Sequence, residues 1–361
     1  MRLPVSMACA RSAHDFMSTS GIEGALFLNT LTTHQNRKTM RYQYLFGPVP
    51  SRRLGISLGI DLVGMKTCSL NCIYCECGRT THLTVARREY APFEAIQSEL
   101  THYLNHYPTP DYITFSGSGE PVLNSRIGDV IRFIRAKTAE ISIAVLTNGT
   151  LLSEKRVQDE LIEATVVIPS LDAATAIAFA KVNRPHPKLN LNTMIDGMVR
   201  FRGMYTGQIW LEVFIVPGIN DTEMELLALK QAIERIHPDR VQLNTLDRPG
   251  VVGNIRAASR EELERILDFW QLGAAEIIAS APERRDLPAY RNDIQSAILG
   301  TIARRPCTLT DLTQILGMHA NEVNKYLDVL AADRKIQAGK QERGIFYRLA
   351  DPDSGLERKG E

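Results

Sequence analysis

From Gly55 to Trp270 the chain alternates short, apolar, β-branched segments with amphipathic ones, and this alternation restricts the possible folds most strongly. The expected strands are residues 57–63, 112–116, 141–147, 165–170, 209–216 and 240–245. The expected helices are residues 92–105, 125–135, 153–162, 191–201, 221–236 and 259–270. Strands and helices that alternate in this way favour a parallel sheet with helices outside it. We therefore predict an α/β fold of six strand–helix units, a partial (β/α)6 barrel.

Three cysteines crowd into one loop directly after the first expected strand. Cys68, Cys72 and Cys75 have the spacing C-x3-C-x2-C, and an aromatic residue, Tyr74, precedes the last of them. Thiolates are the protein ligands of iron–sulfur clusters, and a four-iron cluster normally takes four of them. A loop with three thiolates therefore leaves one iron open to a substrate or cofactor. We predict a [4Fe-4S] cluster bound by Cys68, Cys72 and Cys75.

Two other interpretations of these cysteines are weaker. A disulfide framework suits a short secreted chain, whereas here 6 cysteines are spread over 361 residues. A structural zinc site needs a fourth ligand, which Cys77 or His82 can supply, but C-x3-C-x2-C is not a usual zinc-finger spacing. Cys77 lies only two residues beyond the three cysteines, and we expect it to be a loop thiol.

Motifs rich in Gly, Asn, Asp and Pro follow the other expected strands. They are residues 116–121, 147–150, 170–172, 216–221 and 244–248. Such residues mark turns in any protein, but scattered turns would not coincide so regularly with strand ends. The carboxyl ends of the strands carry the chemistry in a parallel barrel, because the connecting loops converge there. We therefore expect these motifs to form one binding site.

The cysteine spacing with Tyr74 resembles the signature of the radical S-adenosylmethionine (SAM) superfamily. The resemblance implies a partial (β/α)6 TIM-like barrel and the cofactors [4Fe-4S] and SAM, with SAM bound to the open iron. It also implies that the reduced cluster cleaves SAM to a 5′-deoxyadenosyl radical, which abstracts hydrogen from a substrate. The expected partner is a low-potential electron donor of the flavodoxin or ferredoxin type.

The same resemblance assigns candidate SAM contacts at the strand ends. Residues 116–121 look like the superfamily's Gly-Gly-Glu-Pro motif, so Ser118, Gly119 and Glu120 are candidates for binding the SAM amino group. Tyr74 is expected beside the adenine, although packing within the loop is an equal alternative for an aromatic side chain. The expected contacts with the SAM carboxylate or ribose are Ser170, Asp172 and Asn244. No catalytic residue beyond these ligands is assigned.

Within the superfamily, residues 42–270 resemble bacterial and archaeal proteins grouped with the wyosine-base synthases, which modify tRNA guanosine. The resemblance is carried by residues 46–55, 58–61, 66–68 and 77–80. It implies a tRNA substrate, but the archaeal tRNA enzymes use additional N-terminal cysteines, and here only Cys9 precedes Cys68. Arg52, Arg53 and Arg184 can bind phosphate or carboxylate, yet structural ion pairs are the better explanation for them.

The alternation of expected strands and helices ends after residues 282–288. Residues 291–303, 308–316 and 321–332 are expected helices, with a turn at Gly317 and a hairpin at 336–348. This order looks like a winged helix-turn-helix, whose third helix would carry Asn321, Asn324 and Lys325 to DNA. That helix is nearly charge-balanced, whereas phosphate binding needs clustered Lys and Arg, so we favour a module that docks a substrate or partner. Related folds grip leader peptides, which keeps a protein or peptide substrate open.

The expected organisation is an extension at 1–41, a core at 42–281, a winged-helix domain at 290–350 and a flexible tail at 351–361. The extension is a loose arm, or else Met40 is the true start. A balance of 42 Lys and Arg against 41 Asp and Glu gives no global attraction to polyanions. No apolar run is long enough to span a bilayer, and we expect a cytoplasmic protein.

Two functions follow from these patterns. The favoured one is a radical SAM enzyme that acts on tRNA or on a protein or peptide. The alternative is a redox regulator that carries an iron–sulfur cluster and binds DNA through its winged helix. The complete set of motifs at the barrel mouth favours the enzyme, because a regulator has no need of a SAM site.

Overall fold

The computed structural model describes residues 42–51, 53–64, 66–75, 77–246, 251–252, 254–278, 292–304, 306–341 and 344–350. Several predictions fall outside these residues, namely those on the extension 1–41 with Met40, on Arg52, on the linker 279–291 and on the tail 351–361. The described residues belong to one compact unit by their contacts.

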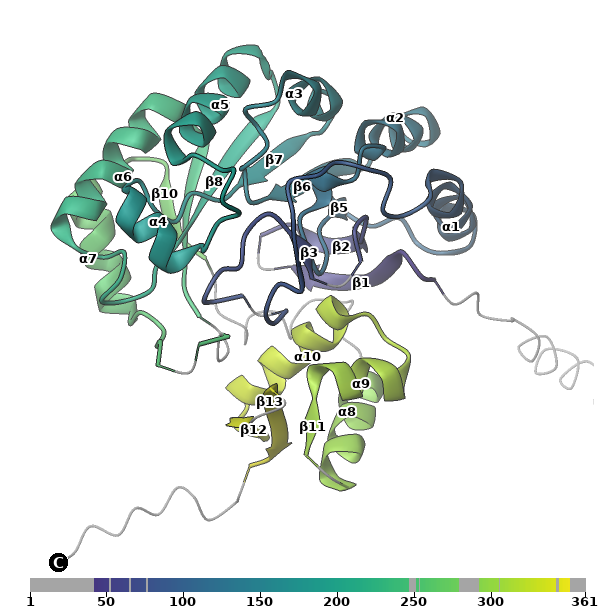
Figure 1. Ribbon diagram of the computed structural model, residues 1–361. Coiled ribbons are helices and arrows are strands. Elements are labelled where there is room, and N and C mark those ends of the chain that lie inside the picture. Colours follow the sequence, from purple (N-terminus) through teal and green to yellow (C-terminus); the bar gives the residue numbers. More distant parts are fainter. Residues whose placement is uncertain are drawn as a thin grey trace, which may run out of the picture. The chain divides into compact units, whose positions relative to one another are not determined.

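The described core is built on an eight-stranded sheet with the order β1-β2-β5-β6-β7-β8-β9-β10 (Figure 1). Its strands are β1 (Leu45–Ser51), β2 (Gly55–Ile60), β5 (Tyr112–Phe115), β6 (Ser142–Thr147), β7 (Val166–Pro169), β8 (Gln208–Phe214), β9 (Arg240–Asn244) and β10 (Ala275–Ile277). All neighbours are parallel except β1 and β2. The expected mostly parallel α/β sheet is therefore confirmed, and β2 and β5 to β9 are its six predicted strands.

Two strands of this sheet, β1 and β10, were not predicted. β1 contains Pro48 and Pro50, which indicate a loop in the sequence because proline has no backbone N–H to donate to a neighbouring strand. The structure accommodates them on an edge strand that pairs antiparallel with β2 alone. β10 is only three residues long, too short for a periodic pattern, and it extends the sheet beyond β9.

Helices lie along the outer side of the curved sheet, as Figure 1 shows. They are α1 (Phe93–His106), α2 (Ile127–Lys137), α3 (Lys155–Leu161), α4 (Ala176–Val182), α5 (Leu191–Met204), α6 (Glu223–Ile236) and α7 (Arg260–Trp270). Local capping fixes several of their starts, as where Ser259 and Glu262 form a capping box at α7. The fourth crossover holds two helices, and α4 was not predicted. No helix of the described residues is long and apolar enough to cross a membrane.

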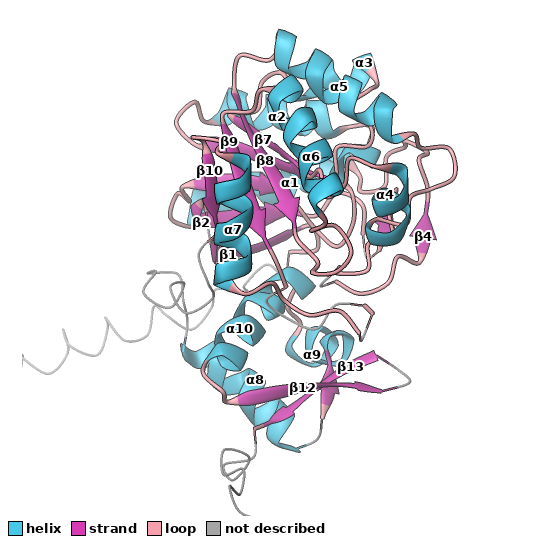
Figure 2. Cartoon of the chain, turned by 90° about the vertical axis from the view of Figure 1, so that its left-hand side faces the viewer, coloured by secondary structure: helices cyan, strands magenta, loops and turns pink. Residues whose placement is uncertain are grey.

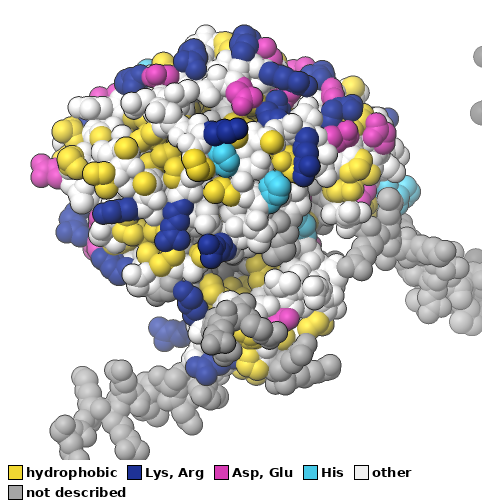
Figure 3. Space-filling view, viewed as in Figure 1, with side chains coloured by type: hydrophobic (Ala, Val, Ile, Leu, Met, Phe, Trp, Pro, Cys, Tyr) yellow, Lys and Arg dark blue, Asp and Glu magenta, His cyan; other side chains and the backbone are white. Residues whose placement is uncertain are grey.

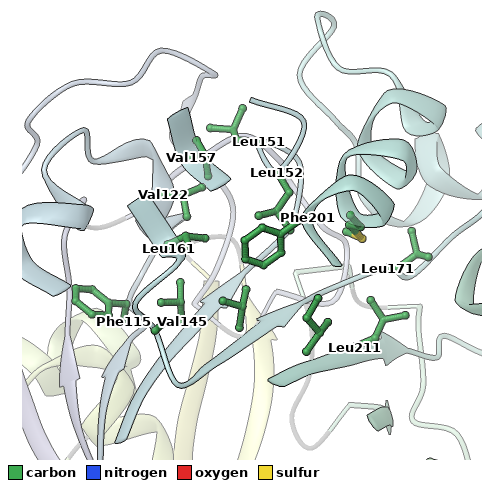
Figure 4. Packing of buried hydrophobic residues seen from close by; sticks show 14 of the residues in the cluster. Phe115, Val122, Val145, Leu151, Leu152, Val157, Leu161, Leu171, Phe201 and Leu211 are labelled. Atoms are coloured by element: carbon green, nitrogen blue, oxygen red, sulfur yellow. The ribbon is translucent and has the colours of Figure 1, made fainter. Parts of the chain in front are cut away.

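The main core fills the space between this sheet and its helices. Phe115, Val145 and Leu211 point from the strands toward Leu161 and Phe201 of the helices (Figure 4). All five side chains are essentially inaccessible to solvent. Burying an aliphatic or aromatic side chain of this size contributes about 1.5–3 kcal/mol, so this layer holds the strand ends in fixed positions.

The C-terminal residues form a smaller module with its own core. It comprises α8 (Asn292–Arg304), β11 (Cys307–Thr308), α9 (Leu309–Leu316), α10 (Ala320–Ala332), β12 (Ile336–Gln341) and β13 (Gly344–Leu349). β12 and β13 form the expected hairpin, and β13 packs against α8 (Figure 2). Leu312 and Leu327 belong to its separate hydrophobic cluster. The order of elements is that of the prediction, with the short β11 added, and the winged-helix assignment itself remains a prediction.

Candidate active site

The cysteine loop begins at the two-residue strand β3 (Thr67–Cys68), which pairs with β4 (His82–Leu83). Cys68, Cys72 and Cys75 are half-buried and form no disulfide bond. Backbone bonds tie the loop to the C-terminal end of α4, since Ile73 N donates to the Val182 carbonyl at 2.9 Å. The loop is therefore held by the fourth strand–helix crossover as well as by its own strand.

Each of the three thiols has a nitrogen donor beside it. Lys66 Nζ lies 2.9 Å from Cys75 Sγ, Asn148 Nδ2 lies 3.5 Å from Cys68 Sγ, and Asn183 Nδ2 lies 3.4 Å from Cys72 Sγ. Hydrogen bonds to the cysteine sulfurs help to set the reduction potential of an iron–sulfur cluster, because they stabilise the negative charge on the thiolates. Sequence reasoning missed Lys66 and Asn183 as parts of this site, and it treated Asn148 only as part of a turn motif.

The ionisation of these groups reflects their burial. Burial, followed by the charge of Glu120, raises the pKa of Cys68 to about 12. The pKa of Cys72 is also raised, first by burial and then by Asp172. Burial is the largest single influence on the pKa of Lys66, and it lowers that pKa. The neighbouring cysteine side chains, above all Cys75 and Cys77, together outweigh burial, so the pKa is raised overall. The Cys68 and Cys72 thiols are thus neutral at neutral pH, and metal binding here would release their protons.

In the described residues, no three side chains of His, Cys, Asp or Glu gather closely enough to bind one metal ion. A four-iron cluster does not require that arrangement, because each of its cysteines binds a different iron atom.

The glycine-rich segment, residues 116–121, follows β5, and its Glu120 contacts the end of β6. Glu120 is 2% exposed, and its carboxylate accepts hydrogen bonds from Thr147 Oγ1 and Asn148 N, both at 2.6 Å. Burial raises the pKa of Glu120 to about 7, although these donors oppose the rise. Because Asn148 also contacts Cys68, Glu120 is linked to the cysteine loop through a single residue.

Glycine is required at two positions of this segment. A Cβ on Gly119 would lie 1.9 Å from the Thr67 carbonyl oxygen, and a Cβ on Gly117 would lie 2.5 Å from the Asp61 carboxylate. Between them Ser118 is buried, and its amide donates to Asp61 Oδ2 at 3.2 Å. The backbone here packs directly on the chain that leads into the cysteine loop, which explains the sequence of small residues.

The structure brings Tyr74 and Asp172 together. The Tyr74 hydroxyl donates to Asp172 Oδ2 at 2.5 Å, and Asn183 Nδ2 donates to the same oxygen at 2.6 Å. The Tyr74 ring stacks on Phe214 with centroids 3.8 Å apart. Burial raises the pKa of Asp172 to about 6. Tyr74 is thus packed into the mouth of the barrel, in line with the packing alternative, and its position beside an adenine remains a prediction.

The two remaining candidates lie at their expected strand ends. Ser170 follows β7, where it bridges to Glu212 of β8. Asn244 ends β9, is 7% exposed, and accepts from the amide of Thr245 at 3.0 Å. Arg53 forms an ion pair with Glu212, as the structural explanation of this arginine expects.

A cavity of about 270 Å³ lies beside the glycine-rich segment. Its lining comes from the β1–β2 region, the ends of β5 and β6, the cysteine loop and α10. The lining residues are Phe46, Ser51, Arg53, Leu54, Ser57, Cys77, Thr114, Ser116, Gly117, Gly119, Leu146, Asn321, Asn324 and Lys325. The mouth of the sheet thus contains a cavity of mixed polar and apolar lining next to the cysteine loop.

Comparisons with known proteins identify the family. Residues 62–229 match the Radical SAM superfamily. A UPF0026 protein of Helicobacter pylori is 32% identical over 305 residues, covering 84% of this chain and 96% of that protein. A Brachyspira hyodysenteriae protein named GTPase Obg is 33% identical over 313 residues, covering 86% of this chain but only 45% of its own length.

Among solved structures, TYW1 with a lysine–pyruvate adduct bound matches 70% of this chain and 82% of its own, with a TM-score of 0.47 and 14% identity. The sequence relatives carry the assignment. The three cysteines and the glycine-rich segment lie within the matched residues, at the strand ends where the geometry brings them together. On this evidence the chain belongs to the UPF0026 proteins, within the radical SAM superfamily.

Proposed function

We propose that this protein is an enzyme that binds a [4Fe-4S] cluster on Cys68, Cys72 and Cys75 and cleaves SAM reductively to modify a tRNA or a protein or peptide. The observation that carries the proposal is the set of nitrogen donors around three half-buried thiols. Such a donor set fits a cluster with negatively charged sulfurs. We also infer a cytoplasmic protein, where cysteines of this kind stay reduced.

When bound, the cluster supplies the electron that breaks the sulfur–C5′ bond of SAM, giving methionine and a 5′-deoxyadenosyl radical that abstracts hydrogen from the substrate. That electron comes from a flavodoxin- or ferredoxin-type donor. The protein holds the reactants in place and excludes water. Lys66 offsets the charge of the thiolates, and Asn148 and Asn183 hold two of the thiol sulfurs in position.

The SAM contacts are part of the same proposal. Gly119 lines the cavity with Ser118 next to it in the chain, and the buried Glu120 carboxylate can balance the positive charge of an amino group. Asp172, with Tyr74 and Asn183 bound to it, forms a second polar cluster, which Asn183 links to Cys72. These two clusters are suited to the amino and ribose ends of SAM.

The face in Figure 3 is not uniform in charge. Lys and Arg are interspersed with Asp and Glu over its upper part, whereas toward the lower left Lys and Arg lie near one another with few Asp or Glu between them. The formal net charge of the chain is only +1. Charge alone therefore does not decide between a tRNA and a peptide substrate.

Anaerobic reconstitution with iron and sulfide, followed by dithionite and SAM, tests the proposal. The wild-type protein should yield 5′-deoxyadenosine on chromatography. Replacing Cys68, Cys72 and Cys75 by alanine should remove both the product and the four-iron signal in electron paramagnetic resonance. Cys77→Ser is the matched control for iron content and should keep a full complement. A protein that holds a complete cluster and releases no 5′-deoxyadenosine would refute the proposal.

A further inference from the structure

Exposed cationic side chains lie on the two chain segments that border the cysteine loop. Arg79 follows the three cysteines in the chain, Lys181 lies in the last turn of α4, and Arg184 lies just after that helix. All three side chains are exposed. The segments that contain them, residues 77–88 and 173–195, include no Asp or Glu. These segments therefore bring only positive formal charge to the surface beside the loop.

Hydrogen bonds hold the two segments together around Asn71, which lies inside the cysteine loop. The Asn71 amide donates to the Arg184 carbonyl at 3.2 Å, and Asn71 Oδ1 accepts from the amide of Thr80, the neighbour of Arg79, at 3.0 Å. The end of α4 is bonded to the same loop, as described above. Figure 2 draws α4 and β4 next to each other on one side of the core, in agreement with these contacts. The three cations thus belong to one surface.

These cations are not neutralised inside the protein. Arg79, Lys181 and Arg184 form no ion pair with any residue in the part of the chain that the structure describes. Elsewhere in the core, arginines are paired with carboxylates, as Arg202 is with Asp239. The structural ion pair expected for Arg184 is therefore not seen among the described residues. An unpaired cation at the surface is open to an anionic partner.

Large apolar side chains are exposed in the same region. Leu83 is 38% exposed and pairs with Cys68 between β3 and β4. Ile177 is 67% exposed and lies one turn before Lys181, on the same side of α4. Neither side chain is aromatic, whereas proteins that read single-stranded RNA stack its bases on aromatic side chains. Exposed apolar groups with a charged rim are suited to a protein partner.

The position of this surface indicates what the partner does. None of its side chains lines the cavity at the barrel mouth, where a substrate would have to enter. An electron donor needs only to approach the cysteine loop, whose thiols are half-buried. Contacts between redox proteins are commonly small, burying less than about 1,200 Å², so a few exposed side chains are sufficient.

We propose that Arg79, Lys181 and Arg184, together with Leu83 and Ile177, form the docking surface for an acidic protein that delivers the electron to the cluster. The donor loses one electron and the cluster gains it, so no atom or proton is exchanged. The inference rests on the proposed function for the cluster, and it adds the place where the donor binds and the charge that the donor must carry. Opposite charges bring such partners together quickly and give the contact a strong dependence on salt.

Isothermal titration calorimetry with a purified flavodoxin, an acidic redox protein, gives the first test on the reconstituted full chain. Arg184→Glu should weaken binding about tenfold in about 0.01 M salt and less than about twofold in 1 M salt, because salt screens the charges. Arg200→Glu, the same change on an exposed side chain of α5, is the control and should bind within about twofold of wild type. Equal affinities of the two variants at low salt would overturn the proposal.

Arg79→Glu repeats the test on the other segment. It should weaken binding by a similar factor, and it avoids residue 184, whose φ of +46° makes the backbone there sensitive to change. In stopped-flow measurements, reduced flavodoxin should reduce the cluster about tenfold more slowly in Arg79→Glu and Arg184→Glu at low salt. Dithionite, a small reductant, should reduce both variants and wild type at rates within about twofold. An equal loss of rate with dithionite would indicate damage at the cluster and overturn the proposal.

Other partners give different results in the same titration. Cytochrome c, a basic redox protein, should not bind, and binding as strong as that of flavodoxin would overturn the proposal. If unfractionated tRNA binds through Arg184 and flavodoxin does not bind, the surface is an RNA site and the proposal is wrong.

The outcome is separate from that of the proposed function. The calorimetric test needs neither SAM nor reductant. A wild-type protein that binds flavodoxin through Arg184 but forms no 5′-deoxyadenosine rejects the proposed function alone. Cleavage of SAM with dithionite, without binding of flavodoxin that depends on Arg184, rejects the docking surface alone.

Discussion

Replacing Glu120 with glutamine should remove a specific pH dependence of stability. The buried carboxyl has a pKa of about 7, raised from the usual 4.5, so the folded protein holds this proton more tightly than the unfolded chain does. Its contribution to stability is therefore complete below pH 4.5 and is lost as the pH rises through about 7. A carboxylate paired with a cation would show the opposite pH dependence, because its contribution to stability is lost as the pH falls.

The magnitude follows from the two pKa values. A shift of one pKa unit corresponds to about 1.4 kcal/mol, so between pH 5 and pH 8 Glu120 alone should lower the free energy of unfolding by about 2–3 kcal/mol. Glutamine does not titrate. The difference in unfolding free energy between wild type and Glu120→Gln should therefore change by that amount across this range, whatever constant cost the lost bonds to Thr147 and Asn148 add.

Urea unfolding of the metal-free protein under argon, followed by circular dichroism at half-unit pH steps, measures this difference. Glu140→Gln, a change on an exposed side chain, is the control for the removal of one carboxylate. If Glu120→Gln loses stability with pH as steeply as wild type does, then Glu120 is not the buried proton-binding group described here.

For three further substitutions the structure gives an expected change in stability. Gly119→Ala would drive a Cβ against the Thr67 carbonyl oxygen, so we expect a loss of about 1–3 kcal/mol of stability in urea and weaker SAM retention in equilibrium dialysis of reconstituted protein. Tyr74→Phe removes the hydroxyl that donates to Asp172, which should cost about 1–3 kcal/mol and raise the pKa of that carboxyl, measurable as a shift in the pH profile of unfolding. Gly317→Ala places a side chain at φ +64° at the end of α9, so Tm should fall by an amount equivalent to about 1–2 kcal/mol, whereas Gln314→Ala should not lower it.

The sheet was predictable because its central strands are continuous apolar runs. Val166–Pro169, for example, is buried along its whole length, as expected for a strand covered on both faces. β1 was not predictable by the same rule, because its prolines and glycine resemble a loop until an edge position is known to be available for them. The short α4 was missed because a single helical turn or two leaves little periodic signal.

The candidate site was predictable where its chemistry is local in sequence. The spacing of the three cysteines and the sequence around Glu120 are visible without a structure. The donors to the thiols were not, since Asn148 and Asn183 lie 80 and 111 residues from the cysteines that they contact. The contact between Asp61 and His319 spans 258 residues and joins two modules, so no pattern within either module indicates it.

The separation between the cysteines and their donors also sets an order of events during synthesis. The cysteine loop leaves the ribosome early, but Asn148 and Asn183 follow only with later strand–helix units, and domains fold from the N-terminus as they emerge. A nascent chain that ends before Asn183 has all three thiols without their full set of nitrogen donors. α10 is made much later than either, so the mouth of the barrel lacks this neighbouring helix while the cysteine loop and its donors are being synthesised.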